Sequence, residues 1–181
     1  MEPVTLTAGG LVLRPWRAGD VPAVLEALRD PAVARWNPAD AASPDLAVAE
    51  TWVEQRADWS GGDHASFAVC AADGAALLGS VSLFRIDRLH DNAEMGYWVA
   101  AGARGRGVAV TAVRALTDWS FNGLGLARVQ LYHAVENPAS CRVAEKAGYR
   151  LEGTARQSYR YGDGLLHDEH LHGRLATDPA D

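Results

Sequence analysis

The sequence has few cysteines, no long apolar run and no excess of positive charge. Its two cysteines, Cys70 and Cys141, are widely spaced, which argues against a disulfide framework or a zinc ribbon. The longest apolar runs are too short to cross a membrane. No basic segment followed by an apolar core opens the chain, so we expect no signal peptide and a cytoplasmic protein without a membrane partner.

The charge balance is acidic, with 23 Asp and Glu against 17 Lys and Arg and a formal net charge of -6. A general nucleic-acid binder needs many cations against the phosphates, so we expect no nucleic-acid partner. With 181 residues and 48% apolar content, the chain suits one domain, 1–181. We expect its core over about 11–175 and a frayed tail over 176–181.

Hydrophobic periodicity and turn residues predict alternating helices and strands. Helices are expected over 18–30, 45–59, 108–122 and 137–148, with Asp20 and Asn137 as N-caps. Strands are expected over 11–16, 66–72, 76–86, 92–100, 127–135, 149–159 and 165–175, with a loop over 37–44. This order indicates an α/β fold with a mixed sheet of about seven strands and about four flanking helices.

Residues 102–110 read GARGRGVAV, a glycine- and arginine-rich turn between a strand and a helix. Gly105 and Gly107 supply two glycines of a dinucleotide-binding G-x-G-x-x-G, but the third is missing, and no P-loop triplet follows. Free N–H groups at a helix start bind anions, and glycine lets the backbone approach them closely. This stretch alone leaves an anion site, with Arg104 and Arg106 adding charge, and a solvated turn equally open.

Three stretches in order resemble the GNAT superfamily of N-acetyltransferases. The pattern R-x-x-G-x-A at 104–109 follows AEMGYWV at 93–99, and is similar to the loop that holds the acetyl-CoA pyrophosphate in that family. ENPASCRVAEKAGYRLEG at 136–153 is similar to a helix of the RimJ/RimL branch, which acetylates N-terminal amines of ribosomal proteins. The resemblance extends over about 11–175, and implies the GNAT fold and acetyl-CoA (coenzyme A) as cofactor.

The resemblance implies a binding site for coenzyme A between two strands and at two helix starts. Gly96 is expected to mark a bulge that opens its strand from the parallel neighbour over 127–135, which leaves room for the pantetheine arm. Asn137 is expected to contact the cofactor, to cap its helix, or both. The expected cofactor-binding residues are Trp98, Val99, Arg104, Gly105, Arg106, Gly107, Val108, Ala109, Asn137 and Ser140.

The resemblance also implies two catalytic residues, Glu94 and Ser140. Glu94 is the expected base, acting through water on the acceptor amine, and the alternative is a surface or paired glutamate on a sheet edge. Ala144 stands where many family members have a tyrosine acid, so Ser140 is expected to stabilise the leaving thiolate. The alternative for Ser140 is an ordinary helix-start residue, and we expect Cys141 to be a core residue rather than a nucleophile.

The stretch HDEHLH at 167–172 differs from the helical H-E-x-x-H zinc pattern. On a strand, His170 and His172 share a face with Asp168, whereas His167 points away. We expect these histidines to be hydrogen-bonded core or acceptor-site residues, and we expect no metal. The tryptophans of the first helical region are expected to be core, with one able to shape the acceptor pocket: Trp36, Trp52 and Trp59.

The predicted function is direct transfer of an acetyl group from acetyl-CoA to a primary amine through a tetrahedral intermediate. The preferred acceptor is a protein N-terminal α-amine. The alternatives are a small-molecule or antibiotic amine, and a catalytically silent acyl-CoA-binding module. A homodimer is expected only by analogy with the family. The sequence leaves open the acceptor, the length of the acyl group and the oligomeric state.

Overall fold

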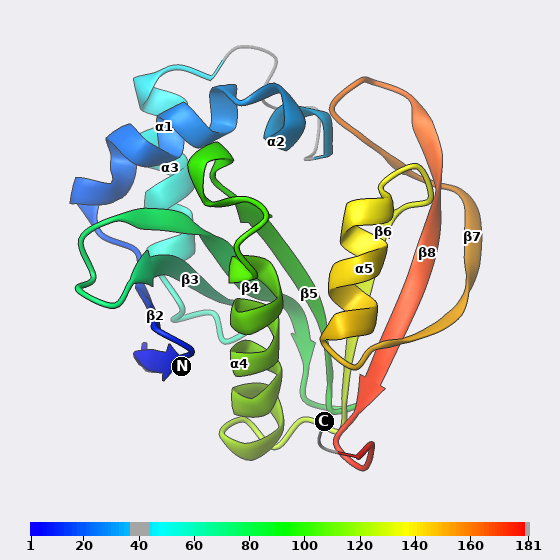
Figure 1. Cartoon of the computed structure of the whole chain (residues 1–181). Coiled ribbons are helices and arrows are strands. Elements are labelled where there is room, and N and C mark those ends of the chain that lie inside the picture. The colour runs from blue at the N-terminus through cyan, green and yellow to red at the C-terminus, as the bar shows by residue number, and fades with distance from the viewer. Residues whose placement is uncertain (37–43, 180–181) are drawn as a thin grey trace.

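The computed structural model describes residues 1–36 and 44–179, so the predicted loop over 37–44 lies outside the described residues except at Pro44. The described chain forms one mixed sheet with helices on both faces (Figure 1). Its eight strands lie in the order β1-β2-β3-β4-β5-β6-β8-β7. The strands are β1 (Leu6–Ala8), β2 (Leu11–Pro15), β3 (Ala65–Ala71), β4 (Leu77–Asp87), β5 (Asn92–Val99), β6 (Arg128–Ala134), β7 (Arg150–Arg160) and β8 (Leu166–Leu175).

The α-helices of the described chain are α1 (Val21–Arg29), α2 (Pro31–Trp36), α3 (Leu46–Ala57), α4 (Val108–Asn122) and α5 (Pro138–Lys146). The mixed α/β fold and the order of its elements are as predicted. Strand β1 and helix α2 were not predicted, because three and six residues are too few to show a period.

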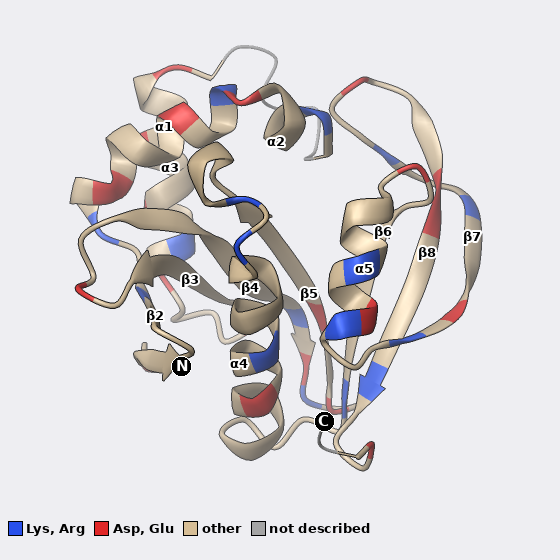
Figure 2. Cartoon of the chain, in the orientation of Figure 1, with Lys and Arg blue, Asp and Glu red and all other residues tan. Residues whose placement is uncertain are grey.

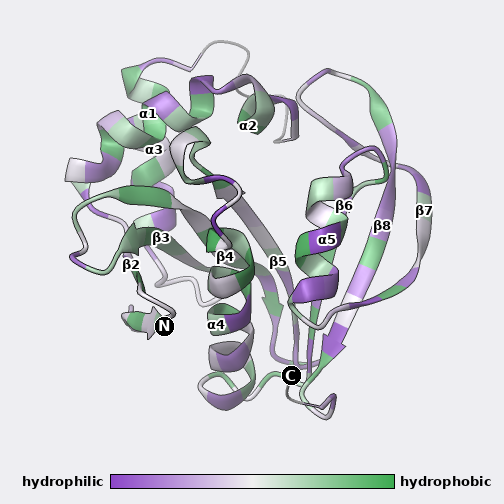
Figure 3. Cartoon of the chain, in the orientation of Figure 1, coloured by the Kyte–Doolittle hydropathy of each residue, from purple (hydrophilic) through white to green (hydrophobic). Residues whose placement is uncertain are grey.

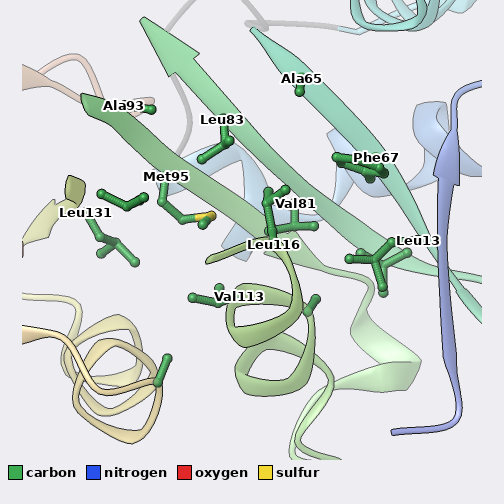
Figure 4. Close-up of a cluster of buried hydrophobic side chains, with 14 of the residues drawn as sticks. Leu13, Ala65, Phe67, Val81, Leu83, Ala93, Met95, Val113, Leu116 and Leu131 are labelled. Carbon is green, nitrogen blue, oxygen red and sulfur yellow. The ribbon is translucent and has the colours of Figure 1, made fainter. Parts of the chain in front are cut away.

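Two hydrophobic clusters lie on opposite faces of the sheet. Helix α4 packs Val113 and Leu116 against side chains of the central strands, such as Phe67 and Val81 (Figure 4). On the other face, α1 and α3 cover a cluster that includes Trp98. The hydrophobic colours of Figure 3 accordingly lie along β3 and β4, whereas β7 is mostly exposed. The central strands are therefore fixed on both faces, as a precisely positioned site requires.

The sheet opens between its parallel neighbours, β5 and β6. Their pairing ends at Met95 and Leu131, and beyond these residues the two strands diverge. The predicted bulge at Gly96 was wrong, because β5 pairs regularly with β4 there and the register shift lies in β4 around Arg85, which has a φ of 49°. A Cβ at Gly96 would lie 2.8 Å from the Phe84 ring, so close packing explains that glycine.

Two smaller expectations also differ from the structure. Asp20 precedes α1, but its carboxylate makes no capping bond to that helix; it accepts two hydrogen bonds from the Arg14 side chain, at 2.7 and 2.8 Å, and one of 2.9 Å from the Arg17 N–H. The chain end is held further than predicted, because Ala176 and Asp178 hydrogen-bond to Ala127 and Leu175. No helix in the described part of the chain has the length and apolar character needed to cross a membrane.

Candidate active site

A cavity of about 930 Å³ occupies the region where β5 and β6 diverge. Glu94 lines it from β5, Tyr132 from β6, and Asn137 and Ser140 from the start of α5. Both predicted catalytic residues therefore face one cavity, although they lie 46 positions apart in the sequence. Glu94 and Tyr97 are three residues apart on β5 and therefore point to opposite faces of the strand. Because both line the cavity, it reaches both faces of the sheet.

Glu94 is a paired glutamate, but it does not lie on a sheet edge. Its strand runs between β4 and β6. One carboxylate oxygen accepts a hydrogen bond of 2.9 Å from Arg85, whose side chain is 78% exposed while that of Glu94 is 24% exposed. The ion pair is thus largely in solvent, where such pairs contribute little energy. The second carboxylate oxygen can still accept a proton or a water molecule.

Ser140 lies in the first turn of α5 and has a hydroxyl partner that the sequence did not reveal. Its Oγ and the Tyr97 hydroxyl are 2.7 Å apart. Burial raises the pKa of Tyr97 to about 12, so this phenol keeps its proton at neutral pH. If Tyr97 donates to Ser140, the serine proton is free to point into the cavity.

Asn137 is the N-cap of α5, as predicted. Its side-chain oxygen accepts a hydrogen bond of 3.2 Å from the Ser140 N–H, and Pro138 follows at the first helical position. This cap holds the Ser140 backbone in the first turn of α5, and so sets the direction of the Ser140 side chain. The Asn137 amide nitrogen is not used by that bond, so capping and ligand contact are compatible.

The loop before α4 has the geometry of an anion site. Gly105 and Gly107 have φ values of 74° and 79°, a region that residues with a Cβ rarely adopt. A Cβ at either glycine would meet no protein atom within 4 Å, so the space above the loop is open. Gly107 is the N-cap of α4 and offers no side-chain acceptor to the N–H groups of Val108 and Ala109. These features fit a pyrophosphate.

The loop before α4 carries two arginines, Arg104 and Arg106, and is partly blue in Figure 2. Their contacts differ. Arg104 donates to the Val99 carbonyl at 3.2 Å and to Asp30 at 2.5 Å, so it ties the loop to the end of α1. The hydrogen bond from Arg104 lowers the pKa of Asp30. Arg106 is exposed on the same loop. Arg104 therefore positions the loop, whereas the exposed side chain of Arg106 is able to move toward a ligand.

Trp98 and Val99 present backbone rather than side chains at the end of β5. The Trp98 side chain packs against Trp16 and Trp52, with ring centroids 6.4 and 6.2 Å away. It therefore supports the strand from the α1 and α3 side. The expected contact of Trp98 and Val99 with the cofactor stays a prediction, and this packing leaves their backbone as the part able to make it.

The far end of the cavity combines aromatic rings with a buried carboxylate. Trp36 and Tyr161 line it with ring centroids 5.7 Å apart. Glu169 is 6% exposed and accepts hydrogen bonds of 2.8 Å from Ser158 and Tyr161. Burial and Glu169 raise the pKa of Tyr161. This end can receive an acceptor with an apolar part and a cationic amine.

Among the three candidate tryptophans, only Trp36 lines this cavity. Trp52 lies under the Arg56 guanidinium, 3.9 Å from the ring centroid. Trp59 is 1% exposed and packs against Phe67 in the core, as expected of a structural residue. The sequence placed all three in one region but could not show which one turns toward the cavity.

The histidines of β8 divide between the two faces as predicted from strand alternation. His167 lies near Trp36 and Tyr161 and bonds Asp163 at 2.9 Å. His170 and His172 turn to the α5 face. Burial lowers the pKa of His172, so its ring is neutral near pH 7.

Cys141 differs from the expected core residue because it is only partly buried. Its sulfur lies 3.6 Å from a Glu145 oxygen and 3.8 Å from the His172 Nε2. Burial and Glu145 raise the pKa of the Cys141 thiol, which disfavours a nucleophilic thiolate.

Three site residues were missed at the sequence level: Arg85, Tyr97 and Glu169. Arg85 reaches Glu94 from a neighbouring strand, and Tyr97 meets Ser140 across 43 positions. Glu169 lies within HDEHLH at 167–172, a stretch whose three histidines are the more evident candidates. Strand alternation could have placed Glu169 on the cavity face, but no local signal marks the other two.

Comparisons with known proteins agree with this geometry. The Acetyltransferase (GNAT) domain family matches residues 10–150. A Bacillus subtilis (strain 168) protein named "Putative ribosomal N-acetyltransferase YdaF" is 36% identical over 132 residues, which are 73% of this chain and 69% of the relative. The spermidine N(1)-acetyltransferase of Vibrio cholerae is 36% identical over 77 residues, 42% of this chain and 44% of the relative.

The structure of Mycobacterium smegmatis RimJ in complex with CoA-disulfide superposes with a TM-score of 0.84 at 25% identity. The match covers 97% of this chain and 90% of that one. The open glycine loop, the uncapped start of α4 and the diverging strands fit the coenzyme A that this structural neighbour holds. The chain belongs to the GNAT family of acetyltransferases, as an acetyl-CoA-dependent N-acetyltransferase of the RimJ/RimL type.

Proposed function

We propose that this enzyme acetylates the N-terminal α-amine of a protein, with Glu94 and Ser140 as its catalytic residues. The observation that carries the proposal is that both side chains face one cavity, where β5 and β6 diverge. The names of the relatives, which include ribosomal N-acetylation, support this acceptor class. Acetyl-CoA supplies the acetyl group as an activated thioester, and the residues of this chain act on the amine and on the sulfur.

The first requirement is a neutral amine. An α-amine has a pKa of about 8, so at pH 7 its deprotonation costs only about 1.4 kcal/mol, against about 4.6 kcal/mol for a lysine amine. Glu94 accepts this proton, directly or through one water, with the carboxylate oxygen that Arg85 does not occupy. A carboxylate is a modest base, and this modest strength suits an α-amine better than a lysine side chain.

The second requirement is stabilisation of the leaving thiolate. Ser140 donates a hydrogen bond to the sulfur from the α5 side, while the Tyr97 hydroxyl donates to the Ser140 Oγ. Two hydroxyls in series polarise each other, which strengthens the outer hydrogen bond. Because Tyr97 has a pKa of about 12, it supports Ser140 as a hydrogen-bond donor and is not deprotonated at neutral pH.

The cavity lining favours a cationic acceptor. Glu94, Glu169, Asp63 and Asp87 line the cavity against two guanidinium groups, those of Arg56 and Arg85, so carboxylates outnumber arginines by four to two among the described residues. Carboxylates raise the local concentration of ammonium groups. Trp36 and Tyr161 border the same space, and provide an apolar surface for the first side chain of a peptide.

The same carboxylates favour a second candidate acceptor, a small polycationic amine. The relative named as a spermidine acetyltransferase shares part of the sequence. A polyamine has several ammonium groups for several carboxylates. It lacks the peptide carbonyl and side chain that a protein N-terminus presents to the aromatic end of the cavity.

An acceptor panel separates these possibilities. The assay measures release of free coenzyme A thiol from acetyl-CoA with three acceptors: short peptides with free N-termini, the same peptides N-acetylated but containing lysine, and spermidine. We expect the highest kcat/KM with free N-termini and none with the blocked peptides. Preference for spermidine would replace the first acceptor by the second. Tight acetyl-CoA binding without turnover on any amine would favour a silent binding module.

A further inference from the structure

We propose that His133, Cys141, His170 and His172 form a Zn²⁺ site between α5 and strands β6 and β8. The four side chains each offer one ligand atom, and these atoms all lie within 4.8 Å of one another. The site borders the active-site cavity, because His133 also lines that cavity and Cys141 follows Ser140, but none of the four residues was assigned a role in the acetyl transfer proposed above. It does not depend on the identity of the acceptor.

The topology brings these residues together from three elements. In the antiparallel pairing of β6 and β8, His133 lies opposite His170, and Leu131 lies opposite His172. Residues two apart on a strand share a face, so the three histidines lie on one face of the sheet. Cys141, in the first turns of α5, completes the group above them.

Two separations between ligand atoms are close to the edges of a tetrahedral zinc site. With Zn–N bonds of about 2.05 Å and Zn–S bonds of about 2.3 Å, a tetrahedron places two nitrogens about 3.3 Å apart, and a nitrogen and a sulfur about 3.6 Å apart. The Nε2 atoms of His133 and His172 are 3.2 Å apart. The Cys141 sulfur is 3.8 Å from the His172 Nε2. The other separations are at most 4.8 Å, so the side chains would move closer together to seat the ion.

The orientation of the rings supports the same geometry. Two imidazoles bound to one tetrahedral zinc through a nitrogen have centroids about 5.2 Å apart. The centroids of His133 and His172 are 5.2 Å apart, and those of His133 and His170 are 5.3 Å apart. The third pair, His170 and His172, is wider at 6.1 Å. The rings of His133 and His172 are stacked at 29° to each other, with their Nε2 atoms 3.2 Å apart.

The hydrogen bond of His133 to the backbone leaves its Nε2 lone pair facing the group. His133 Nδ1 lies 2.8 Å from the Ala134 carbonyl, which can only accept, so Nδ1 carries the proton and Nε2 the lone pair. Zinc-bound histidines typically donate their outer N–H to such a carbonyl. The Nε2 atom of His172 faces His133 and Cys141, and the Nδ1 atom of His170 is buried without a hydrogen-bond partner among the described residues. A hydrogen bond between His133 and His172 alone would leave the convergence of Cys141 and His170 unexplained.

Three nitrogens and one thiolate are a ligand set that suits zinc. Four protein ligands close the coordination sphere, which is typical of a structural site. On binding, the Cys141 sulfur forms a bond to Zn²⁺ and its proton passes to solvent, with no change in oxidation state. The ion would fasten the start of α5, which also carries Asn137 and Ser140, to the sheet. The expectation of no metal weighed only the histidines of β8, because nothing in the sequence joins them to His133 and Cys141.

The test uses the untagged full-length protein, freed of metal with a chelator and then exchanged into Co²⁺ or Zn²⁺. We expect one ion per chain, a thiolate-to-cobalt charge-transfer band, and visible d–d bands of tetrahedral intensity. When free zinc exceeds its Kd a hundredfold, the thermal midpoint should rise by about 5–11 °C.

Matched variants locate the ion. Cys141→Ser should abolish the charge-transfer band, and His170→Gln should weaken Zn²⁺ binding at least tenfold. The controls are Cys70→Ala, which changes a cysteine in the opposite cluster, and His90→Gln, which changes an exposed histidine. Circular dichroism verifies that each variant folds. The proposal is overturned if the wild-type protein binds less than one-tenth equivalent of either ion. It is also overturned if Cys141→Ser retains the charge-transfer band of the wild type.

Discussion

Replacing Gly107 with valine tests the assignment of the phosphate loop. Gly107 has a φ of 79° and is the N-cap of α4, and a Cβ built there meets no protein atom within 4 Å. The valine side chain would therefore occupy the open space above the helix start, where a pyrophosphate would lie. The protein itself offers no clash, so the effect on binding comes from the ligand side.

The size of the effect can be estimated in two parts. An L-residue in the left-handed region costs about 1–2 kcal/mol, which lowers stability and not intrinsic affinity. Each lost hydrogen bond between a backbone N–H and a charged phosphate costs about 1.5–3 kcal/mol, or roughly 10–150-fold in Kd. Gly164, in the turn between β7 and β8, has the same φ of 79° and the same open surroundings. Gly164→Val therefore reproduces the backbone strain far from the loop.

The assay is isothermal titration of coenzyme A into both variants, with the free energy of unfolding measured by urea. Both variants should lose similar stability, while only Gly107→Val should lose affinity, by at least tenfold. Equal Kd values for the two variants and the wild type would refute the assignment of the pyrophosphate to this loop.

Three other predictions address the chemistry and the fold. Glu94→Gln should lower kcat/KM by about 10²–10⁴-fold near neutral pH, and less with an α-amine acceptor. The loss should shrink as the pH approaches the pKa of the acceptor, and superimposable pH profiles would remove Glu94 from the mechanism. Ser140→Ala should lower kcat within about tenfold without changing coenzyme A affinity, and adding Tyr97→Phe should lower it little further, because Tyr97 acts through Ser140. Additive losses in this double-mutant cycle would contradict the relay. Asp20→Asn should destabilise the protein by about 3–5 kcal/mol at pH 7, because it leaves Arg14 buried without its carboxylate. Burial acts to raise the pKa of Asp20, but the hydrogen bonds from Arg14 and Arg17 outweigh it and lower that pKa. The contribution of Asp20 is therefore complete above its unfolded pKa of about 3.9 and is lost as pH falls through the lower folded value, so urea unfolding at pH 3 should show a smaller difference.

The sequence predicted the elements of the fold well where periodicity or turn chemistry is strong. The helix predicted over 137–148 was found from its N-cap, Asn137, and the strands predicted over 66–72 and 76–86 correspond to β3 and β4. The opening of the sheet was predicted at the right place but for the wrong reason. The sheet opens because the pairing of β5 with β6 ends at Met95 and Leu131. The register shift lies in β4 instead, and its position depends on how β4 pairs with β5, which the sequence of one strand does not reveal.

The candidate site was predictable where a local pattern carries the chemistry, as in the loop around Gly107. It was not predictable where two distant residues meet. The partners Arg85 for Glu94, Tyr97 for Ser140, and Asp30 for Arg104 all require the register of the sheet and the placement of helices. These contacts depend on the tertiary structure, and a periodic pattern reports only which face a residue occupies.

The divergence of β5 and β6 has a consequence for mutational scanning. Beyond Met95 and Leu131, the facing edges of two interior strands are left without a strand partner, so their peptide groups can serve a ligand. Contacts made by peptide groups survive the replacement of almost any side chain. If coenzyme A binds to these peptide groups, an alanine scan along the ends of β5 and β6 would underestimate their contribution. Substitution by proline, or replacement of single amides by esters, would reveal the contribution that alanine leaves intact.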